Sequence, residues 1–106
     1  IYNHHDDWEM AESHPITLTI ENLPFADSAL KVTHQRIDQA HSNAYTEWVR
    51  QGKPMYPASG QYAALKARDG LELLTAPQQV NSTDGKVTLT FDLPVHGISL
   101  VRIRAA

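Results

Sequence analysis

The sequence contains no cysteine, and it has no long run of apolar residues. The first absence excludes disulfides, thiol catalysis and cysteine-based zinc sites together, although it leaves the cellular compartment open. The second gives no candidate for a membrane-spanning helix, and the N-terminus lacks the charged-then-apolar shape of a signal peptide. We therefore expect no membrane partner.

An excess of charge of one sign is also missing. Nine basic and twelve acidic residues are scattered along the chain and give a net charge of −3. No basic stripe is present, so nucleic acid is not an expected partner, and we expect no cofactor.

The length limits what the chain can be. With 106 residues, 42% of them apolar, residues 1–106 are expected to form a single domain around one core. A (β/α)₈ barrel needs at least about 200 residues. The chain begins with Ile1 rather than Met, and residues 1–5 resemble the middle of a β-strand. We interpret the chain as a fragment of a longer protein.

Apolar and polar residues alternate in several short segments, which is typical of half-buried strands. The pattern predicts strands at residues 1–5, 16–22, 30–39, 71–74, 78–80, 87–93 and 98–103. Residues 23–27 are expected to end the second of these strands. Asp84-Gly85 predicts a type I′ turn, because both central positions of that turn need φ > 0.

Helices are predicted between the strands. Ser42 or Asn43 supplies the N-cap of the first helix, and Gly52 fits the left-handed position after its last turn. A second helix is predicted at residues 59–68. Its inward-facing residues are expected to be Tyr62 and Leu65. The sequence therefore predicts a mainly β fold, an antiparallel β-sandwich of the immunoglobulin or fibronectin III kind with one or two short inserted helices.

The densest group of specific polar side chains spans the junction between the third predicted strand and the first helix. Its candidate residues are His34, Arg36, Asp38, His41, Asn43, Tyr45 and Trp48. A glycosidase needs two carboxyl groups placed around one bond, and nothing in the sequence fixes Asp38 and Glu47 in that way. A catalytic triad is equally unsupported, because Ser42 adjoins His41 without a strand-turn-helix elbow. We interpret the group as a structural or interdomain hydrogen-bond network, with no catalytic residue.

Two further groups invite a binding function. His4 and His5 suggest a metal site, but adjacent strand residues point to opposite faces, so we expect solvated polar residues and no metal ligand there. Aromatic residues could stack on a sugar ring. Tyr45 and Trp48 share a helical stripe with Val49 that is typical of a core, which leaves two better candidates for a surface role, Trp8 and Tyr56.

The run His-Gln-Arg-Ile-Asp-Gln-Ala-His-Ser-Asn-Ala-Tyr at residues 34–45 resembles a segment of family 39 glycoside hydrolases, the β-xylosidases and their α-L-iduronidase relatives. Three further segments are similar to the same region: Gly-Lys-Pro-Met-Tyr-Pro at 52–57, Gln-Tyr-Ala-Ala-Leu at 61–65, and Leu-Glu-Leu-Leu at 71–74 with Val-Thr-Leu-Thr-Phe at 87–91.

The resemblance implies a non-catalytic C-terminal accessory domain whose partner is the catalytic barrel of the same polypeptide. It implies a parent enzyme that hydrolyses xylo-oligosaccharides with retention, through glutamates that lie on the barrel. The alternative is an independent carbohydrate-binding module. Because an interdomain face exposes apolar side chains when its partner is absent, self-association of the fragment is also expected.

Overall fold

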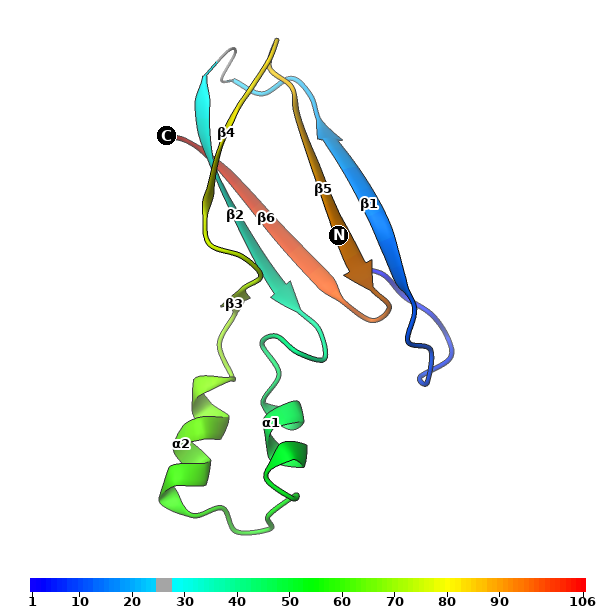
Figure 1. Ribbon diagram of the computed structural model, residues 1–106, viewed down its shortest axis with the longest axis vertical. Coiled ribbons are helices and arrows are strands. Elements are labelled where there is room, and N and C mark those ends of the chain that lie inside the picture. Colours follow the sequence, from blue (N-terminus) through cyan, green and yellow to red (C-terminus); the bar gives the residue numbers. More distant parts are fainter. Residues whose placement is uncertain (25–27) are drawn as a thin grey trace.

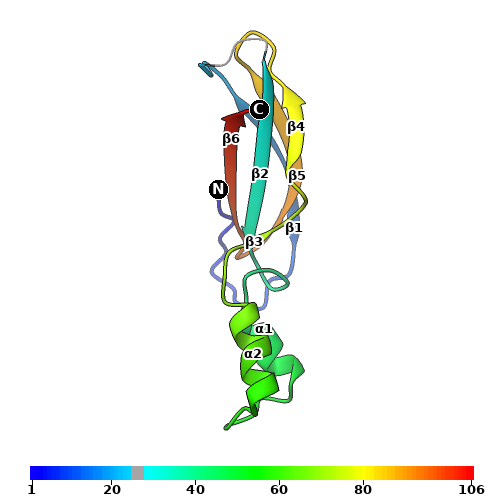
Figure 2. The ribbon, with the colours of Figure 1, turned by 90° about the vertical axis from the view of Figure 1, so that its left-hand side faces the viewer.

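The computed structural model describes residues 1–24 and 28–106, so the predicted strand end at residues 23–27 lies partly outside the described residues. The chain forms two antiparallel sheets that face each other, with the helices at one end (Figures 1 and 2). The strands are β1 (Ser13–Ile20), β2 (Ala29–Ile37), β3 (Glu72–Leu73), β4 (Gln78–Asn81), β5 (Val87–Pro94) and β6 (Ile98–Ala105). The predicted β-sandwich with short inserted helices is confirmed.

Strand pairing divides the chain between the sheets. One sheet consists of β1 and β5, paired along their whole length from Ser13 opposite Pro94 to Ile20 opposite Val87. In the other sheet β2 is central: β6 pairs with one edge, and β4 and β3 pair with the first and second parts of β2. The chain crosses from the second sheet to the first between β4 and β5.

The core lies where β2 faces β5. Leu30 and Val32 of β2 and Val87 and Leu93 of β5 are 5% exposed or less, so the side chains with alternate spacing in these strands point inward. The predicted alternation in β1 is confirmed as well, since Ile16, Leu18 and Ile20 are each less exposed than the threonines between them.

The turn between β4 and β5 is the one predicted. Asp84 and Gly85 have φ of 52° and 72°, and Thr83 and Lys86 exchange backbone hydrogen bonds of 3.0 and 2.9 Å across it. A Cβ on Gly85 would also lie 3.2 Å from the carbonyl oxygen of Leu23, whose N–H donates to Gly85. Glycine is therefore required both by the turn and by the close approach of Leu23.

The helices α1 (Ala44–Arg50) and α2 (Ser59–Ala67) form a hairpin that extends away from the sheets (Figure 1). Asn43, rather than Ser42, is the N-cap of α1, because its side chain accepts from the N–H of Thr46. Gly52 has φ of 89°, and backbone bonds from Gly52 to Val49 and from Lys53 to Trp48 close the helix end. Both cap predictions are confirmed.

Because the hairpin extends outward, the molecule is long and thin. Its Cα radius of gyration is 17.3 Å, whereas a compact domain of this length is expected near about 13 Å. The predicted inward position of Tyr62 is wrong for this reason: among the described residues α2 packs mainly on α1, and Tyr62 is 60% exposed. Tyr45 and Val49 are also exposed, at 64% and 42%, so their predicted core stripe is wrong too.

The predicted strand at residues 1–5 is reduced to one bridge, between Tyr2 and Ile98. Pairing ends at Asn3, whose N–H donates to Gly97 and whose side-chain amide donates to the carbonyl oxygen of Leu93. His4 and His5 therefore leave the sheet. Strand β2 likewise ends at Ile37 instead of residue 39, because the next residue, Asp38, forms a turn.

Candidate functional site

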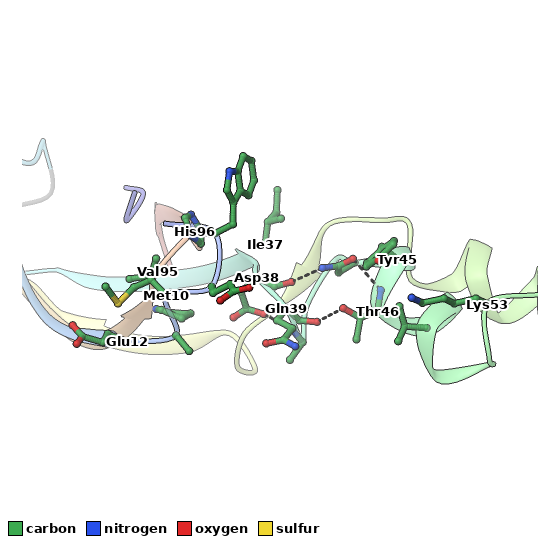
Figure 3. Close-up of a pocket in the computed structure, with 17 residues that line it drawn as sticks. Met10, Glu12, Ile37, Asp38, Gln39, Tyr45, Thr46, Lys53, Val95 and His96 are labelled. Carbon is green, nitrogen blue, oxygen red and sulfur yellow. Dashed lines mark hydrogen bonds between the residues drawn. The ribbon is translucent and has the colours of Figure 1, made fainter. Parts of the chain in front are cut away.

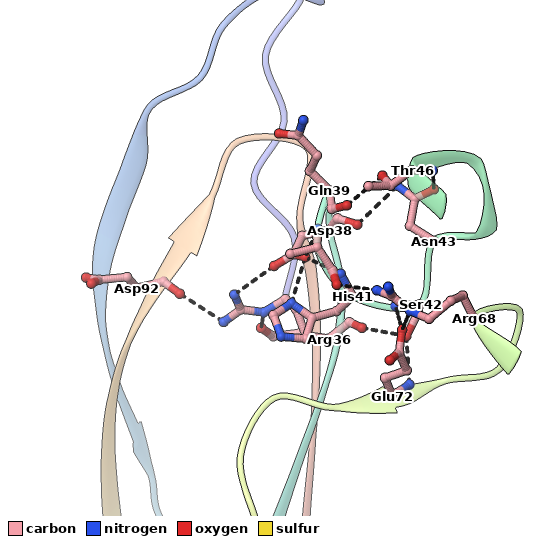
Figure 4. Close-up of polar contacts among 12 residues, drawn as sticks. Arg36, Asp38, Gln39, His41, Ser42, Asn43, Thr46, Arg68, Glu72 and Asp92 are labelled. Carbon is pink, nitrogen blue, oxygen red and sulfur yellow. Dashed lines mark hydrogen bonds and ion pairs between the residues drawn. The ribbon is translucent and has the colours of Figure 1, made fainter. Parts of the chain in front are cut away.

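Arg36 is the centre of the polar group predicted from the sequence. Its side chain is only 3% exposed, between the two sheets. Nε donates to the hydroxyl of Ser99 over 2.8 Å, and Nη2 donates to the backbone carbonyl of Asp92 over 2.8 Å. Nη1 lies 3.4 Å from Asp38 Oδ2 (Figure 4). The guanidinium thus joins β2, β6, β5 and the turn after β2.

His34 precedes Arg36 on the same inward face of β2. Its Nε2 is 2.8 Å from the Ser99 hydroxyl, and its ring packs edge-to-face on Phe91 at 4.6 Å. Burial lowers the pKa of His34, and the charge of Arg36 lowers it further. The Ser99 hydroxyl therefore forms hydrogen bonds with both Arg36 Nε and His34 Nε2.

Asp38 ends β2 by accepting three hydrogen bonds at Oδ1. The donors are the backbone N–H groups of Ala40 and His41 and the His41 ring nitrogen Nδ1, each at 2.8 Å. Burial acts to raise the pKa of Asp38, but the hydrogen bonds from His41 and Ala40 outweigh it, so the pKa is lowered. Asp38 therefore stays ionised and fixes the turn.

Ser42 ties this turn to β3 and α2. Its hydroxyl donates to the carbonyl oxygen of Arg36 over 2.8 Å and accepts from the N–H of Glu72 over 2.7 Å, while its N–H donates to Glu72 Oε1. Arg68 Nε donates to the same carboxylate over 3.1 Å, and Arg68 also donates to Ala40. The bonds from Ser42 and Arg68 lower the pKa of Glu72.

Asn43 closes the group at the start of α1. Besides capping the helix, it donates through Nδ2 to the carbonyl oxygen of Asp38 over 3.2 Å. Thr46 adds a bond from its hydroxyl to the carbonyl oxygen of Gln39 over 2.6 Å. We refer to Arg36, Asp38, His41, Ser42, Asn43 and Glu72 as the joint network, because they connect the sheets to the helical hairpin (Figure 4).

Of the other predicted members, His34 bonds to Ser99 inside the sandwich, and Tyr45 and Trp48 lie outside the joint network. Tyr45 and Trp48 contact each other on α1 at 5.7 Å between ring centroids, and Trp48 Nε1 donates to the carbonyl oxygen of Pro54 over 2.9 Å. They belong to the helical hairpin.

A separate ion cluster stabilises the hairpin. The buried carboxylate of Glu47 accepts from Arg50 Nε over 2.6 Å and from Gln51 over 3.1 Å, and Gln51 also donates to the Gln61 carbonyl in α2. The bonds from Arg50 and Gln51 lower the pKa of Glu47 to about 2.

The sequence did not reveal two members of the joint network, Ser42 and Glu72, or two residues that bond to it, Arg68 and Ser99. Each has an ordinary residue type for its element, and the group forms only when β3 and β6 pair with β2. The registers of these two pairs place Arg36 opposite both Glu72 and Ser99. The positive φ of Ser42, 54°, is visible only in the structure.

The bonding of the carboxylates does not favour acid–base catalysis at the joint network or at the ion cluster of the hairpin. A glycosidase general acid needs a raised pKa. Asp38, Glu47 and Glu72 all have lowered pKa values and are held by cationic or N–H donors. Their bonds instead have the form of a network that fixes one element relative to another.

A groove of about 980 Å³ runs beside the network, between the loop of residues 8–12 and α1 (Figure 3). Ile37 and Asp38 line its middle and Tyr45 lines one end, with Val95 and His96 at the other (Figure 3). Trp8 also lines it, is 90% exposed, and stacks on His96 at 6.0 Å. The second aromatic candidate, Tyr56, is 88% exposed in the loop of the hairpin.

Neither a metal-binding cluster nor a membrane-spanning helix is found in the part of the chain that the structure describes. His4 Nε2 lies 3.3 Å from Asp6, but no group of three or more His, Asp or Glu side chains that could hold a metal ion gathers within residues 1–24 and 28–106. Over the same residues, no helix is long and apolar enough to cross a membrane.

No protein-family model matches the sequence. Several solved structures share the fold. A bacterial orthologue of human α-L-iduronidase has a TM-score of 0.77 at 17% identity, over 96% of this chain and 19% of that chain. A GH39 enzyme from Xanthomonas axonopodis pv. citri has a TM-score of 0.77 at 13% identity, over 91% of this chain and 19% of that chain. A monomeric β-xylosidase from Caulobacter crescentus CB15 has a TM-score of 0.72 at 13% identity, over 93% of this chain and 20% of that chain.

Because the match covers 91% of the chain or more, it includes most of residues 1–31, before the region where the sequence resemblance is densest. The chain spans about a fifth of the length of the structures it matches. The resemblance to family 39 glycoside hydrolases is therefore confirmed at the level of the fold: this chain folds like one segment of such enzymes.

Proposed function

We propose that this chain is a non-catalytic accessory domain of a glycoside hydrolase similar to the β-xylosidases and α-L-iduronidases. The observation that carries the proposal is the fold, which is shared over nearly the whole chain with glycosidases about five times its length. The parent enzyme would hydrolyse xylo-oligosaccharides with retention, using carboxylates of a catalytic barrel in the same polypeptide.

The chemistry of the joint network supports the non-catalytic part of the proposal. Its carboxylates are kept ionised by donors within the chain, so none is available as a general acid near neutral pH. In the proposed enzyme the network has a structural role, because it sets the angle between the sheets and the helical hairpin.

The experiment compares the 106-residue chain with the intact protein on an aryl β-xyloside. The intact protein is expected to turn the substrate over and the purified chain is not. Turnover by the purified chain would contradict the accessory role. An intact protein that is inactive on aryl β-xylosides but active on an aryl iduronide would keep the role and change the substrate.

A second candidate function is carbohydrate binding by the chain itself. The groove favours it, because the exposed Trp8 ring and Tyr45 border a surface with polar side chains such as Gln39 and Lys53. Xylo-oligosaccharide should then quench Trp fluorescence in a saturable way, and Trp8→Ala should remove the quenching while Tyr2→Ala does not. A flat titration to millimolar sugar would eliminate this candidate.

Self-association of the isolated chain is expected from the accessory role, because the catalytic barrel that would cover its apolar face is missing. Large apolar side chains are exposed on it, Met55 at 81% and Tyr2 at 74% among them. Sedimentation velocity should show association that grows with concentration, and a monomer at every concentration would oppose this expectation.

A further inference from the structure

The outer face of the sheet centred on β2 is apolar at one end and polar at the other. The polar end carries Lys31 and Thr33, which lie opposite Arg104 and Arg102. At the other end Ile37 lies opposite Ile98, and Gln35 lies opposite both Leu100 and Leu73. Residues directly opposite in a sheet share a face, so these side chains form one surface.

We refer to this surface as the outer apolar patch, and its residues are Tyr2, Ile37, Leu73, Ile98 and Leu100. The aliphatic members are between 40% and 47% exposed, and Tyr2 is 74% exposed. Tyr2 joins the patch through its bridge to Ile98. Contiguous exposed apolar side chains of this kind are typical of an interaction surface.

The outer face of the other sheet has the opposite character. Thr17 lies opposite Thr90 and Thr19 lies opposite Thr88, and all four are exposed. The hydroxyls of Thr19 and Thr88 are 3.3 Å apart. One outer face is thus suited to water, and the other is suited to contact with protein.

A buried polar atom at the centre of the patch supports this difference. Among the described residues, Oε1 of Gln35 is buried and has no hydrogen-bond partner, while Nε2 makes a long contact of 3.5 Å with the Leu71 carbonyl. Leaving a buried acceptor unsatisfied is unfavourable. A surface that covers the patch and offers a donor to the Gln35 amide, once its oxygen turns outward, would remove that cost.

The path of the chain indicates which part of the proposed enzyme covers the patch. The residues at the N-terminal end run along β6 beside the patch: Ser99 N–H donates to the Ile1 carbonyl over 2.7 Å, and Asn3 N–H donates to Gly97 over 3.0 Å. In the proposed enzyme, the polypeptide that leads from the catalytic domain therefore arrives next to Tyr2 and Ile98. About four fifths of each matching structure lies outside this fold, so the neighbouring part is large.

We infer that the outer apolar patch is the face on which the catalytic domain of the same polypeptide packs, with a hydrogen-bond donor of that domain directed at Gln35. This inference rests on the proposed function, and it adds which face of this domain meets the catalytic domain and which side chain accepts a hydrogen bond from it.

Cysteine accessibility in the intact protein tests the inference, since this chain contributes no cysteine of its own. Leu100→Cys places a thiol in the patch, and Thr88→Cys places a matched thiol on the outer face of β5. Each is labelled with iodoacetamide in native protein and in urea, and peptide mass spectrometry gives the ratio of the two rates. Leu100→Cys should be protected at least tenfold more than Thr88→Cys.

Equal protection at the two positions, or greater protection of Thr88→Cys, overturns the inference. Protection of Leu100→Cys that disappears on hundredfold dilution also overturns it, because the occupant is then a second copy of the protein. The proposed function is judged separately by activity: an intact protein without glycosidase activity removes that proposal whichever thiol is protected. Gln35→Leu gives an independent check, since loss of the buried acceptor should leave Leu100→Cys protected less than in the parent protein.

Discussion

Nε of Arg36 donates to the hydroxyl of Ser99 across the β2–β6 pair over 2.8 Å, although 63 positions separate the two residues. Both side chains are 3% exposed. The same hydroxyl also forms a hydrogen bond with His34, and the same guanidinium donates to Asp38 and to the backbone of β5. The contact therefore links the inside of the sandwich to the joint network.

Replacing Arg36 by Met should destabilise the chain by about 3 kcal/mol, because Asp38, Ser99 and the carbonyl of Asp92 lose a buried donor together. Urea unfolding followed by Trp fluorescence measures the change. The matched control is Arg102→Met on the outer face of β6, expected within about 0.5 kcal/mol of the parent chain. Similar effects of the two substitutions would contradict the buried role of Arg36.

His34 should titrate below 6.5 in the folded chain, because burial and then the charge of Arg36 lower its pKa. The unfolded chain then binds more protons, so the stability from neutral His34 is present above pH 6.5 and is lost as the pH falls through the folded pKa. NMR of the ring protons measures the pKa. Arg36→Met should raise it and Arg102→Met should not; an unchanged value in Arg36→Met would show that the Arg36 charge has no part in the shift.

Glu47 should make the helical hairpin sensitive to acid. Its pKa in the fold is about 2, below its ordinary value of 4.5, so its contribution to stability is present above pH 4.5 and is lost as the pH falls towards 2. The Glu47→Gln variant should lose less stability over that range than the parent chain, measured by urea unfolding at each pH. Glu9→Gln, in an exposed loop, is the control. Parallel pH curves for the parent chain and Glu47→Gln would remove this assignment.

Two glycines should respond to alanine with opposite signs. Gly52 has φ of 89°, which costs an L-residue about 1–2 kcal/mol, so Gly52→Ala should be destabilising by that amount. Gly60 lies in α2 with open space around a Cβ, so Gly60→Ala should stabilise the chain by up to about 1 kcal/mol. Thermal unfolding followed by circular dichroism checks both. If Gly52→Ala is as stable as the parent chain, the left-handed helix end is wrong.

Local patterns accounted for much of the fold. Period-2 alternation predicted β1, β5 and β6, Asp84-Gly85 predicted the turn, and Asn43 with Gly52 predicted the ends of α1. In each case the deciding interaction lies within a few residues, such as the Asn43 side chain and the N–H of Thr46. Interactions between residues so close in the chain can be predicted from the sequence.

The wrong predictions concern which side chains of an element are covered by other elements. Tyr62, Tyr45 and Val49 have helical core spacing, but a helix that extends from the sheets has only one neighbour to cover it. For the site, the polar run indicated that Arg36 and Asp38 need partners. It could not indicate Ser99 or Glu72, because strand register over long separations decides which residues lie opposite Arg36.

The helical hairpin lies between β2 and β3 in the chain, and its tip, residues 52–58, is far from every strand pair (Figure 1). Lengthening such a tip is inexpensive, since doubling a flexible loop costs only about 0.6 kcal/mol in closure entropy. The sheets keep their register whatever the hairpin length, because Ser42 and Glu72 fasten both ends of the insertion. The joint network thus makes the hairpin an appended element, whose length and surface can change without altering the strand pairing of the sandwich.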